Sequence, residues 1–365
     1  MTDTPSLWLG LMTGSSADGC DMVVMARTAS ACRCLHAHHV AMPEALRTTV
    51  LDLLQPDHNE LHHAMHAHQH LATWMAEGVL AFLADVGLRM DQIAGVGLHG
   101  QTIRHQPNGL WGYTKQIGCP SRLSALLGCP VVADFRSADI AVGGQGAPLA
   151  PFFHEAFFSA PNRAVLNLGG IANVTILGSP LIGFDTGPGN ALLDAWCMQH
   201  QGQPFDQGGQ WASTGRVVPS LLTQWLTDPF FLQAAPKSTG RDHFNLSWLA
   251  GHLVGTSHRP EDVQATLVQL TAQSVSLALN AYHHRINNML LCGGGVYNSV
   301  LLSALRHALP SVALTVSDAH GVGARWVEAM GFAWLASERM ANRAIATQSV
   351  TGASRPVVLG GVFHV

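Results

Sequence analysis

Four glycine-rich segments in this sequence each follow a short apolar run and combine small residues with carboxylate, hydroxyl or amide side chains. They are residues 14–21, 169–173, 187–190 and 293–298. Turns of small residues let the backbone approach a ligand, and successive N–H groups can surround a phosphate group. The positions that could contact a nucleotide in this way are Gly14, Ser15, Ser16, Ala17, Asp18, Gly19, Cys20, Asp21, Gly169, Gly170, Asn173, Gly187, Gly189, Asn190, Gly293, Gly294, Gly295 and Asn298.

The first segment, residues 14–21, places the acids Asp18 and Asp21 beside serine hydroxyls. Because Mg²⁺ at phosphate sites takes one or two carboxylates together with phosphate oxygens, Asp18 is a candidate magnesium ligand. The segment is not a Walker A loop, since Gly19 is followed by Cys20 rather than by lysine and a hydroxyl residue. An ordinary β-hairpin turn is the alternative interpretation.

Asp185 ends a predicted strand, residues 182–185, and precedes a glycine turn after which a helix is expected from Ala191. A helix N-terminus can receive phosphate, and a carboxylate beside it can accept a proton from an attacking hydroxyl group or water. Asp185 is therefore the candidate catalytic base, and a helix-capping role is the alternative. An aspartic protease would need two Asp-Thr-Gly motifs, and this sequence has one.

The elements that position these segments follow from the hydrophobic pattern. Apolar runs predict strands at residues 7–12, 22–26, 93–98, 131–135, 164–168, 174–177, 182–185 and 289–292, and helices at residues 60–85, 261–281 and 327–340. Each half opens with strand, glycine turn and strand, so we expect two α/β domains of similar plan with ligands at the carboxyl ends of the strands. The expected domains are residues 1–150 plus about 346–365, and residues 151–345, with a candidate hinge at 143–151.

The composition argues against several other functions. A net charge of -4 gives no basic surface for nucleic acid. No stretch approaches the about 20 apolar residues of a membrane-spanning helix, and the N-terminus lacks the basic region of a signal peptide, so we expect a cytoplasmic protein with no membrane partner. The seven cysteines contain no CxxC pair, which argues against a disulfide framework or zinc site. Because Lys115 and Lys237 are the only lysines, phosphate would be held largely by backbone N–H groups and a metal ion.

Histidines are concentrated between His58 and His70, and three of them, His62, His66 and His70, follow each other at intervals of four. This spacing places them on one face of a helix, where imidazoles can bind a transition metal. No acid joins them in an HExxH pattern, so we interpret the cluster as an exposed polar helix face without a role in activity.

Taken together, these motifs resemble the anhydro-N-acetylmuramic acid kinase family. The matching segments occur in family order over nearly the whole chain and are residues 10–21, 97–105, 132–154, 167–175, 183–194, 236–244, 290–298 and 327–336. The resemblance implies a two-domain α/β fold of the actin/hexokinase-like (ribonuclease H-like) class, with ATP in the cleft between the domains. One departure is Ser15, which stands where the family has threonine and keeps the hydroxyl group.

The resemblance also implies a reaction. The enzyme would open the ring of 1,6-anhydro-N-acetylmuramic acid, a fragment of recycled peptidoglycan, and phosphorylate it with ATP and Mg²⁺ to N-acetylmuramic acid 6-phosphate. Family roles carried over by motif make Asp185 the catalytic base. The sugar contacts match Thr102, Arg136 and Glu328, to which His99 and Gln101 are added from the same HGQT motif as Thr102. A second copy of the chain is a candidate partner, in a homodimer.

Three alternatives make different predictions. A kinase for another sugar would share the glycine segments but lack the HGQT, DFR and VEAM motifs, which are present here. An Hsp70-like module would bind ATP without sugar-dependent turnover. A glycosidase would need a pair of catalytic carboxylates and has no use for four glycine loops.

Overall fold

The computed structural model describes residues 4–14, 16–29, 31–54 and 58–365, which form two compact units. Unit 1 comprises Met1–Phe157 and Trp326–Val365, and unit 2 comprises Phe158–Arg325. The two-domain α/β class is therefore confirmed, but the expected boundaries differ. The chain leaves unit 1 after Phe157 rather than after residue 150, and it returns at Trp326, well before the expected position near 346.

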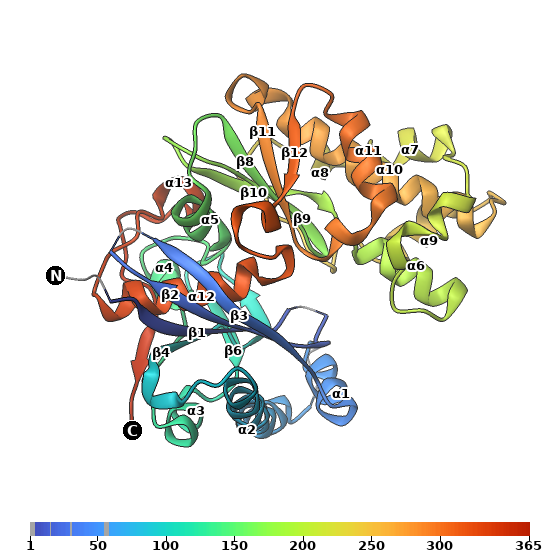
Figure 1. The fold of residues 1–365 in the computed structure, drawn as a ribbon. Coiled ribbons are helices and arrows are strands. Elements are labelled where there is room, and N and C mark those ends of the chain that lie inside the picture. Colours follow the sequence, from blue (N-terminus) through green and yellow to red (C-terminus); the bar gives the residue numbers. More distant parts are fainter. Residues whose placement is uncertain (1–3, 15, 30, 55–57) are drawn as a thin grey trace. The chain divides into compact units, whose positions relative to one another are not determined.

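Unit 1 is built on a six-stranded sheet in the order β13-β7-β4-β1-β2-β3, beside a separate β5-β6 hairpin (Figure 1). Its strands are β1 (Ser6–Met12), β2 (Gly19–Arg27), β3 (Cys32–Ala41), β4 (Ile93–Leu98), β5 (Gln101–Gln106), β6 (Tyr113–Ile117), β7 (Val131–Ala133) and β13 (Gly361–Phe363). β2 runs antiparallel to β1 and β3, whereas β4 and β7 continue the sheet in parallel with β1. The antiparallel pair β1-β2 is the hairpin expected around the first glycine segment.

Seven α-helices are assigned to the described part of unit 1, and two of them cover opposite faces of its sheet. They are α1 (Glu44–Asp52), α2 (Glu60–Asp85), α3 (Pro120–Leu127), α4 (Ser137–Ala141), α5 (Ala150–Phe158), α12 (Val327–Met340) and α13 (Gln348–Thr351). Because strand side chains alternate between faces, Leu9 and Leu11 of β1 join the core under α2, and Gly10 faces α12.

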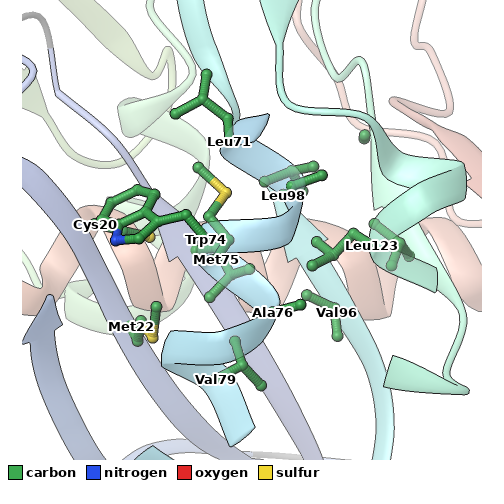
Figure 2. Close-up of a cluster of buried hydrophobic side chains, with 14 of the residues drawn as sticks. Cys20, Met22, Leu71, Trp74, Met75, Ala76, Val79, Val96, Leu98 and Leu123 are labelled. Atoms are coloured by element: carbon green, nitrogen blue, oxygen red, sulfur yellow. The ribbon is translucent and has the colours of Figure 1, made fainter. Parts of the chain in front are cut away.

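The core under α2 is formed by apolar and sulfur-containing side chains from α1, α2 and α3 and from strands of unit 1, and part of it is drawn in Figure 2. Leu71 and Met75 of α2 are completely buried, as are Met22 of β2 and Val96 of β4. Burying a side chain of this size contributes roughly 1.5–3 kcal/mol relative to exposure, so this cluster holds the strand ends of unit 1 in place.

Helix α12 lies directly on the sheet of unit 1, which explains the difference from the expected boundary. A methyl group added to Gly10 would lie 1.8 Å from the carbonyl oxygen of Ala329, and one added to Gly97 would lie 1.9 Å from that of Phe332. No side chain larger than hydrogen fits between helix and strands at these positions. The hydrophobic pattern predicted α12 at its correct residues but could not show which sheet it covers.

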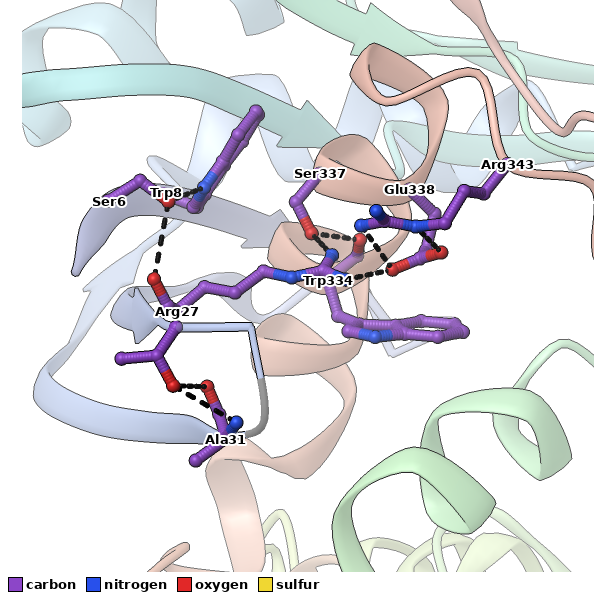
Figure 3. A network of polar contacts seen from close by, with 9 residues as sticks. Ser6, Trp8, Arg27, Ala31, Trp334, Ser337, Glu338 and Arg343 are labelled. Atoms are coloured by element: carbon purple, nitrogen blue, oxygen red, sulfur yellow. Dashed lines mark hydrogen bonds and ion pairs between the residues drawn. The ribbon is translucent and has the colours of Figure 1, made fainter. Parts of the chain in front are cut away.

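The far end of α12 is tied to β2 by a polar network (Figure 3). Arg27 bonds both Ser337 and Glu338, and Arg343 donates to Glu338 from the following loop, 2.7 Å from Nε to Oε2. Burial raises the pKa of the Glu338 carboxyl, but the hydrogen bonds from Arg343 and Arg27 outweigh it, and the pKa is lowered overall. The ionised form of Glu338 therefore stabilises the folded structure at this end of unit 1.

Unit 2 repeats the same strand plan. Its sheet has the order β10-β9-β8-β11-β12 and consists of β8 (Arg163–Leu168), β9 (Ile171–Ile176), β10 (Ile182–Pro188), β11 (Asn288–Cys292) and β12 (Ala313–Val316). β9 is antiparallel to β8 and β10, whereas β11 and β12 are parallel to β8. This matches the strand order β3-β2-β1-β4-β7 of unit 1 and is the expected ribonuclease H-like topology.

The helices of unit 2 are α6 (Ala191–Gln201), α7 (Pro219–Trp225), α8 (Pro229–Leu232), α9 (Leu246–Leu253), α10 (Pro260–Leu279) and α11 (Ser299–Ala308). The long helix α10 is buried along most of its length and packs on β10, α6 and α11. No helix in the described ranges combines the length and apolarity needed to cross a bilayer.

Candidate active site

Asp185 lies within β10 rather than at its end, because the strand continues to Pro188 past an irregularity in the pairing between Asp185 and Gly187. Its strand partner is Asn173 of β9, which in turn pairs with Asn167 of β8. Directly paired residues of antiparallel strands share a face of the sheet, so these three polar side chains form a row across the sheet. The capping alternative is excluded, since Asn190 stands at the start of α6.

The carboxyl group of Asp185 is held by a segment more than fifty residues away in the sequence. The backbone N–H of Thr239 donates to Oδ2 at 2.9 Å, and the N–H of Asp185 donates to the carbonyl oxygen of Lys237 at 3.1 Å. Burial raises the pKa of Asp185 to about 6, although the Thr239 N–H and the charge of Lys237 oppose the rise. A base with a pKa near the working pH suits proton transfer, because it is both available and basic enough.

Lys237 is almost fully buried, at 9% exposure, and its ammonium group is already engaged. Nζ donates to the backbone carbonyl oxygen of Phe230 at 3.1 Å and lies 4.5 Å from the centre of the Phe230 ring. Burial lowers the pKa of Lys237, and the charge of Asp185 opposes this. Lys237 therefore acts on Asp185 electrostatically, and it is not a free phosphate-binding lysine.

The second and third glycine segments form one hydrogen-bonded structure at the start of α6. The N–H of Gly189 donates to Gly170 at 2.9 Å, and the N–H of Asn190 donates to Gly169 at 2.8 Å. The side chain of Asn190 adds a bond to the carbonyl of Leu168 at 2.9 Å. A methyl group added to Gly189 would lie 2.3 Å from the carbonyl oxygen of Gly169, so this close backbone approach requires glycine.

The fourth glycine segment follows β11 and lies beside the end of β8. Gly293 has a positive φ of 83° and packs against Asn167, whereas Gly294 is exposed with open space where a side chain would be. Asn298 caps α11, because its Oδ1 accepts the N–H of Leu301 at 3.0 Å. The space beside Gly294 is thus open, and the side chain of Asn298 is committed to the helix.

In unit 1, fewer residues of the first glycine segment lie outside the strands than the sequence predicted. Gly19, Cys20 and Asp21 already belong to β2, and Ser15 lies outside the described residues. Burial raises the pKa of the Cys20 thiol, which points into the hydrophobic core and offers no phosphate contact. In the remaining turn, the hydroxyl of Ser16 donates to Asp18 at 2.8 Å, and Asp18 is exposed.

The motif residues expected to contact sugar lie together in unit 1. Arg136 donates from Nη2 to His99 Nε2 and from Nη1 to the carbonyl of Gly146, both at 2.8 Å. Burial, followed by the charge of Arg136, lowers the pKa of His99 to about 3, so this imidazole is neutral and accepts the bond. Burial also lowers the pKa of Arg136 to about 10, and Glu328 opposes this.

Three polar atoms of this group are buried without a hydrogen-bond partner among the described residues. They are Nδ1 of His99, Oε1 of Gln101 and Nε of Arg136. Burial raises the pKa of Glu328, the charge of Asp21 adds to the rise, and Arg136 opposes it. Thr102 accepts a bond from Gln116 at 3.2 Å. Unpaired buried donors and acceptors are costly, so these atoms are suited to a polar ligand.

The histidine cluster lies on the exposed face of α2, as expected, and no group of three or more metal-ligating side chains is found in the described ranges. His68 differs from the others, because its Nδ1 accepts the N–H of Gly118 at 3.0 Å and ties α2 to the β6-α3 connection. We expect simultaneous replacement of His62, His66 and His70 by Gln to leave turnover near the wild-type rate. Strong loss of activity that added zinc restores would contradict this.

Sequence reasoning missed the contribution of the segment 237–243. It was recognised as part of a motif, but its contacts with Asp185 are backbone contacts that no residue pattern reveals. Arg241 was also missed: its guanidinium lies over Gly170, with Nη2 3.2 Å from where a methyl group would stand. The available signal was the scarcity of lysine, because it leaves arginine as the main cationic side chain of this sequence.

A repeated ribonuclease H-like unit with glycine turns at its strand ends defines the class of actin-like ATPases and sugar kinases. The profile of the anhydro-N-acetylmuramic acid kinase family matches residues 6–365. Proteins named anhydro-N-acetylmuramic acid kinase include one from Bordetella petrii, 47% identical over 98% of this chain and 96% of the relative. Another, from Pseudomonas fluorescens, is 43% identical over 98% and 99%. This chain belongs to the anhydro-N-acetylmuramic acid kinase family.

Solved structures give weaker similarity. The (R)-2-hydroxyglutaryl-CoA dehydratase component A of Acidaminococcus fermentans aligns with a TM-score of 0.49 and 13% identity, over 90% of this chain and 96% of the other. The activator of the 2-hydroxyisocaproyl-CoA dehydratase of Clostridium difficile, with bound ADPNP, aligns with a TM-score of 0.47 and 13% identity, over 92% and 96%.

Proposed function

We propose that this chain uses ATP to convert 1,6-anhydro-N-acetylmuramic acid into N-acetylmuramic acid 6-phosphate and ADP, during recycling of peptidoglycan. Family membership supports the substrate. The observation that carries the chemistry is Asp185, a buried carboxyl group whose pKa is raised to about 6 beside the glycine turns that begin α6.

The proposed reaction couples two bond changes. Asp185 accepts a proton from water as the water oxygen bonds to C1 of the sugar. The bond between C1 and the bridging oxygen breaks, and that oxygen, still bonded to C6, takes the γ-phosphoryl group as the phosphoanhydride bond to ADP breaks. Asp185 holds the proton at its carboxyl group until product release.

The sugar is assigned to the polar group of unit 1. Muramic acid carries a carboxylate on its lactyl ether, and the unpaired Nε of Arg136 is a charged donor suited to it. Gln101 and Glu328 offer acceptors to sugar hydroxyls and the acetamido N–H, and Thr102 offers a hydroxyl group. His99 keeps Arg136 in place as a neutral acceptor.

The nucleotide phosphates are assigned to the first glycine segment and to the glycine turns at Gly169–Gly170 and Gly294. Magnesium fits the exposed carboxylate of Asp18, because one carboxylate plus phosphate oxygens is a usual set of ligands for this ion. When bound, the ion would neutralise charge on the transferring phosphoryl group. Cytoplasmic location and a homodimer remain further proposals.

The function is tested by ADP release measured with and without the anhydro sugar, in the presence of Mg²⁺. We expect ADP release to depend on the sugar. Equal rates with and without it would rule out the proposed kinase activity, and release stimulated only by another sugar would change the substrate.

The pH dependence of kcat/KM provides a separate prediction. Because the base must be ionised and its pKa is raised to about 6, activity should be lost as the pH falls through about 6 rather than near the ordinary carboxyl value of 3.8. Initial rates between pH 5 and pH 8, at saturating ATP, locate this limb. An acid limb near 4 would show that Asp185 is not the titrating base.

A further inference from the structure

A chain of polar contacts leads from Asp228 to Asp185 through the segment 237–243. Asp228 Oδ2 faces His243 Nε2 at 3.1 Å, and Nδ1 of the same imidazole faces the hydroxyl of Thr239 at 3.3 Å. The backbone N–H of Thr239 then donates to Asp185 Oδ2 at 2.9 Å. Each residue in this chain fixes the next, and the last contact is on the base itself.

Asp228 is a firm anchor for this chain. Its carboxylate also accepts the N–H of Phe230 at the start of α8 and the indole N–H of Trp248 in α9, both at 2.9 Å. Burial raises the pKa of Asp228, but the hydrogen bonds from Phe230, Trp248 and His243 outweigh it, and the pKa is lowered overall. The anchoring group is therefore ionised throughout the working pH range.

His243 is held between this anchor and an aromatic ring. Its ring stacks on that of Phe244 with 4.2 Å between centres and 15° between planes, and Phe244 is buried. With the Nε2 proton donated to Asp228, Nδ1 accepts the Thr239 hydroxyl; in the doubly protonated ring, Nδ1 donates to the same oxygen. The link to Thr239 therefore persists in both charge states of His243.

We propose that His243, anchored by Asp228, is a positioning residue that holds the N–H of Thr239 against the carboxylate of Asp185. The inference rests on the proposed function only in taking Asp185 as the base. That N–H stabilises the ionised carboxyl group and opposes the rise of its pKa, and Lys237 acts in the same direction. The same segment carries Arg241 over Gly170, so its placement sets both the base and a cation at the nucleotide turn.

The test compares His243→Phe, which keeps the stacking but removes both hydrogen bonds, with Thr239→Val, which removes only the hydroxyl link. In both variants we expect kcat to fall about 10- to 100-fold, because displacing a catalytic group by about 1 Å can lower the rate by up to about 100-fold. The acid limb of the pH profile should move up by about one pH unit, since a hydrogen bond to the carboxylate is lost. His243→Gln, which offers one donor and one acceptor, should restore part of both effects.

His258→Phe, at an exposed histidine of the same unit, is the matched control and should behave like the wild type. A purely structural role of His243 would lower the melting temperature and leave the acid limb in place. If the limb stays at its wild-type position in folded His243→Phe or in Thr239→Val, the positioning role is refuted.

Hydrogen exchange of the Thr239 amide separates this inference from the proposed function, because it needs no substrate. We expect the amide to be protected in the wild type and to exchange at least about tenfold faster in Thr239→Val and His243→Phe. Equal protection would overturn the inference even in an active kinase. If the two variants lose protection but the wild-type protein has no kinase activity, the proposed function is refuted and the positioning role of His243 is still supported.

Discussion

Replacing Asp185 with Asn is expected to lower sugar-dependent ATP turnover by ~10²–10⁴-fold, the usual effect of removing a general base. Asn keeps the shape of the side chain and can still accept the Thr239 N–H, so the local structure should persist. Nucleotide affinity should change little, because the phosphates are assigned to glycine backbone. Single-turnover kinetics and calorimetric ATP titration on the same preparation measure both quantities.

The two measurements separate the possible roles of Asp185. Normal turnover in Asp185→Asn would place the base elsewhere. Loss of ATP binding with residual chemistry would make Asp185 a metal ligand instead. The exposed acid Asp91, replaced by Asn in the same way, is the matched control and should affect neither quantity.

Replacing Arg136 with Gln is expected to lower kcat/KM for the anhydro sugar by about 10- to 100-fold, mainly through KM. Hydrogen bonds to charged groups contribute about 1.5–3 kcal/mol, and the unpaired Nε of Arg136 is the donor assigned to the sugar carboxylate. The KM for ATP should stay near the wild-type value. Steady-state kinetics with each substrate varied in turn make the comparison.

Lysine at position 136 should not restore the activity, because a single ammonium group cannot bond His99, the carbonyl of Gly146 and the substrate in the geometry of the guanidinium. Arg33→Gln, at an exposed arginine of β3, is the control for loss of charge. A rise in the KM for ATP with an unchanged KM for sugar would contradict the assignment of Arg136.

The local pattern was sufficient to predict elements and their order. Apolar runs and helical periodicity placed β1, β4, α2 and α12 within a residue or two, and the repeated strand, turn and strand predicted two similar units. The pattern also placed Asp185 in a strand before glycines, although the strand runs on to Pro188. These features depend on neighbouring residues, which is why the sequence shows them.

Contacts between distant segments were not predictable in this way. The position of α12 in unit 1 depends on the absence of side chains at Gly10 and Gly97, which only the packed structure reveals. The partners of Asp185 come from the backbone of Lys237 and Thr239, and backbone groups leave no residue signature. The joining of two glycine segments at the start of α6 has the same origin. The roles assigned to the individual site residues stay predictions.

The central claim is that one enzyme uses water to open the anhydro ring and the released oxygen to take the phosphoryl group. A single turnover in water enriched in a heavy oxygen isotope, quenched rapidly and analysed by fragment mass spectrometry, tests it most directly. We predict one heavy oxygen in the product, on C1 of the sugar, and none in the bridge between C6 and the phosphate. Heavy oxygen in the phosphoryl group, or a phosphorylated product that retains the anhydro ring, would contradict the account.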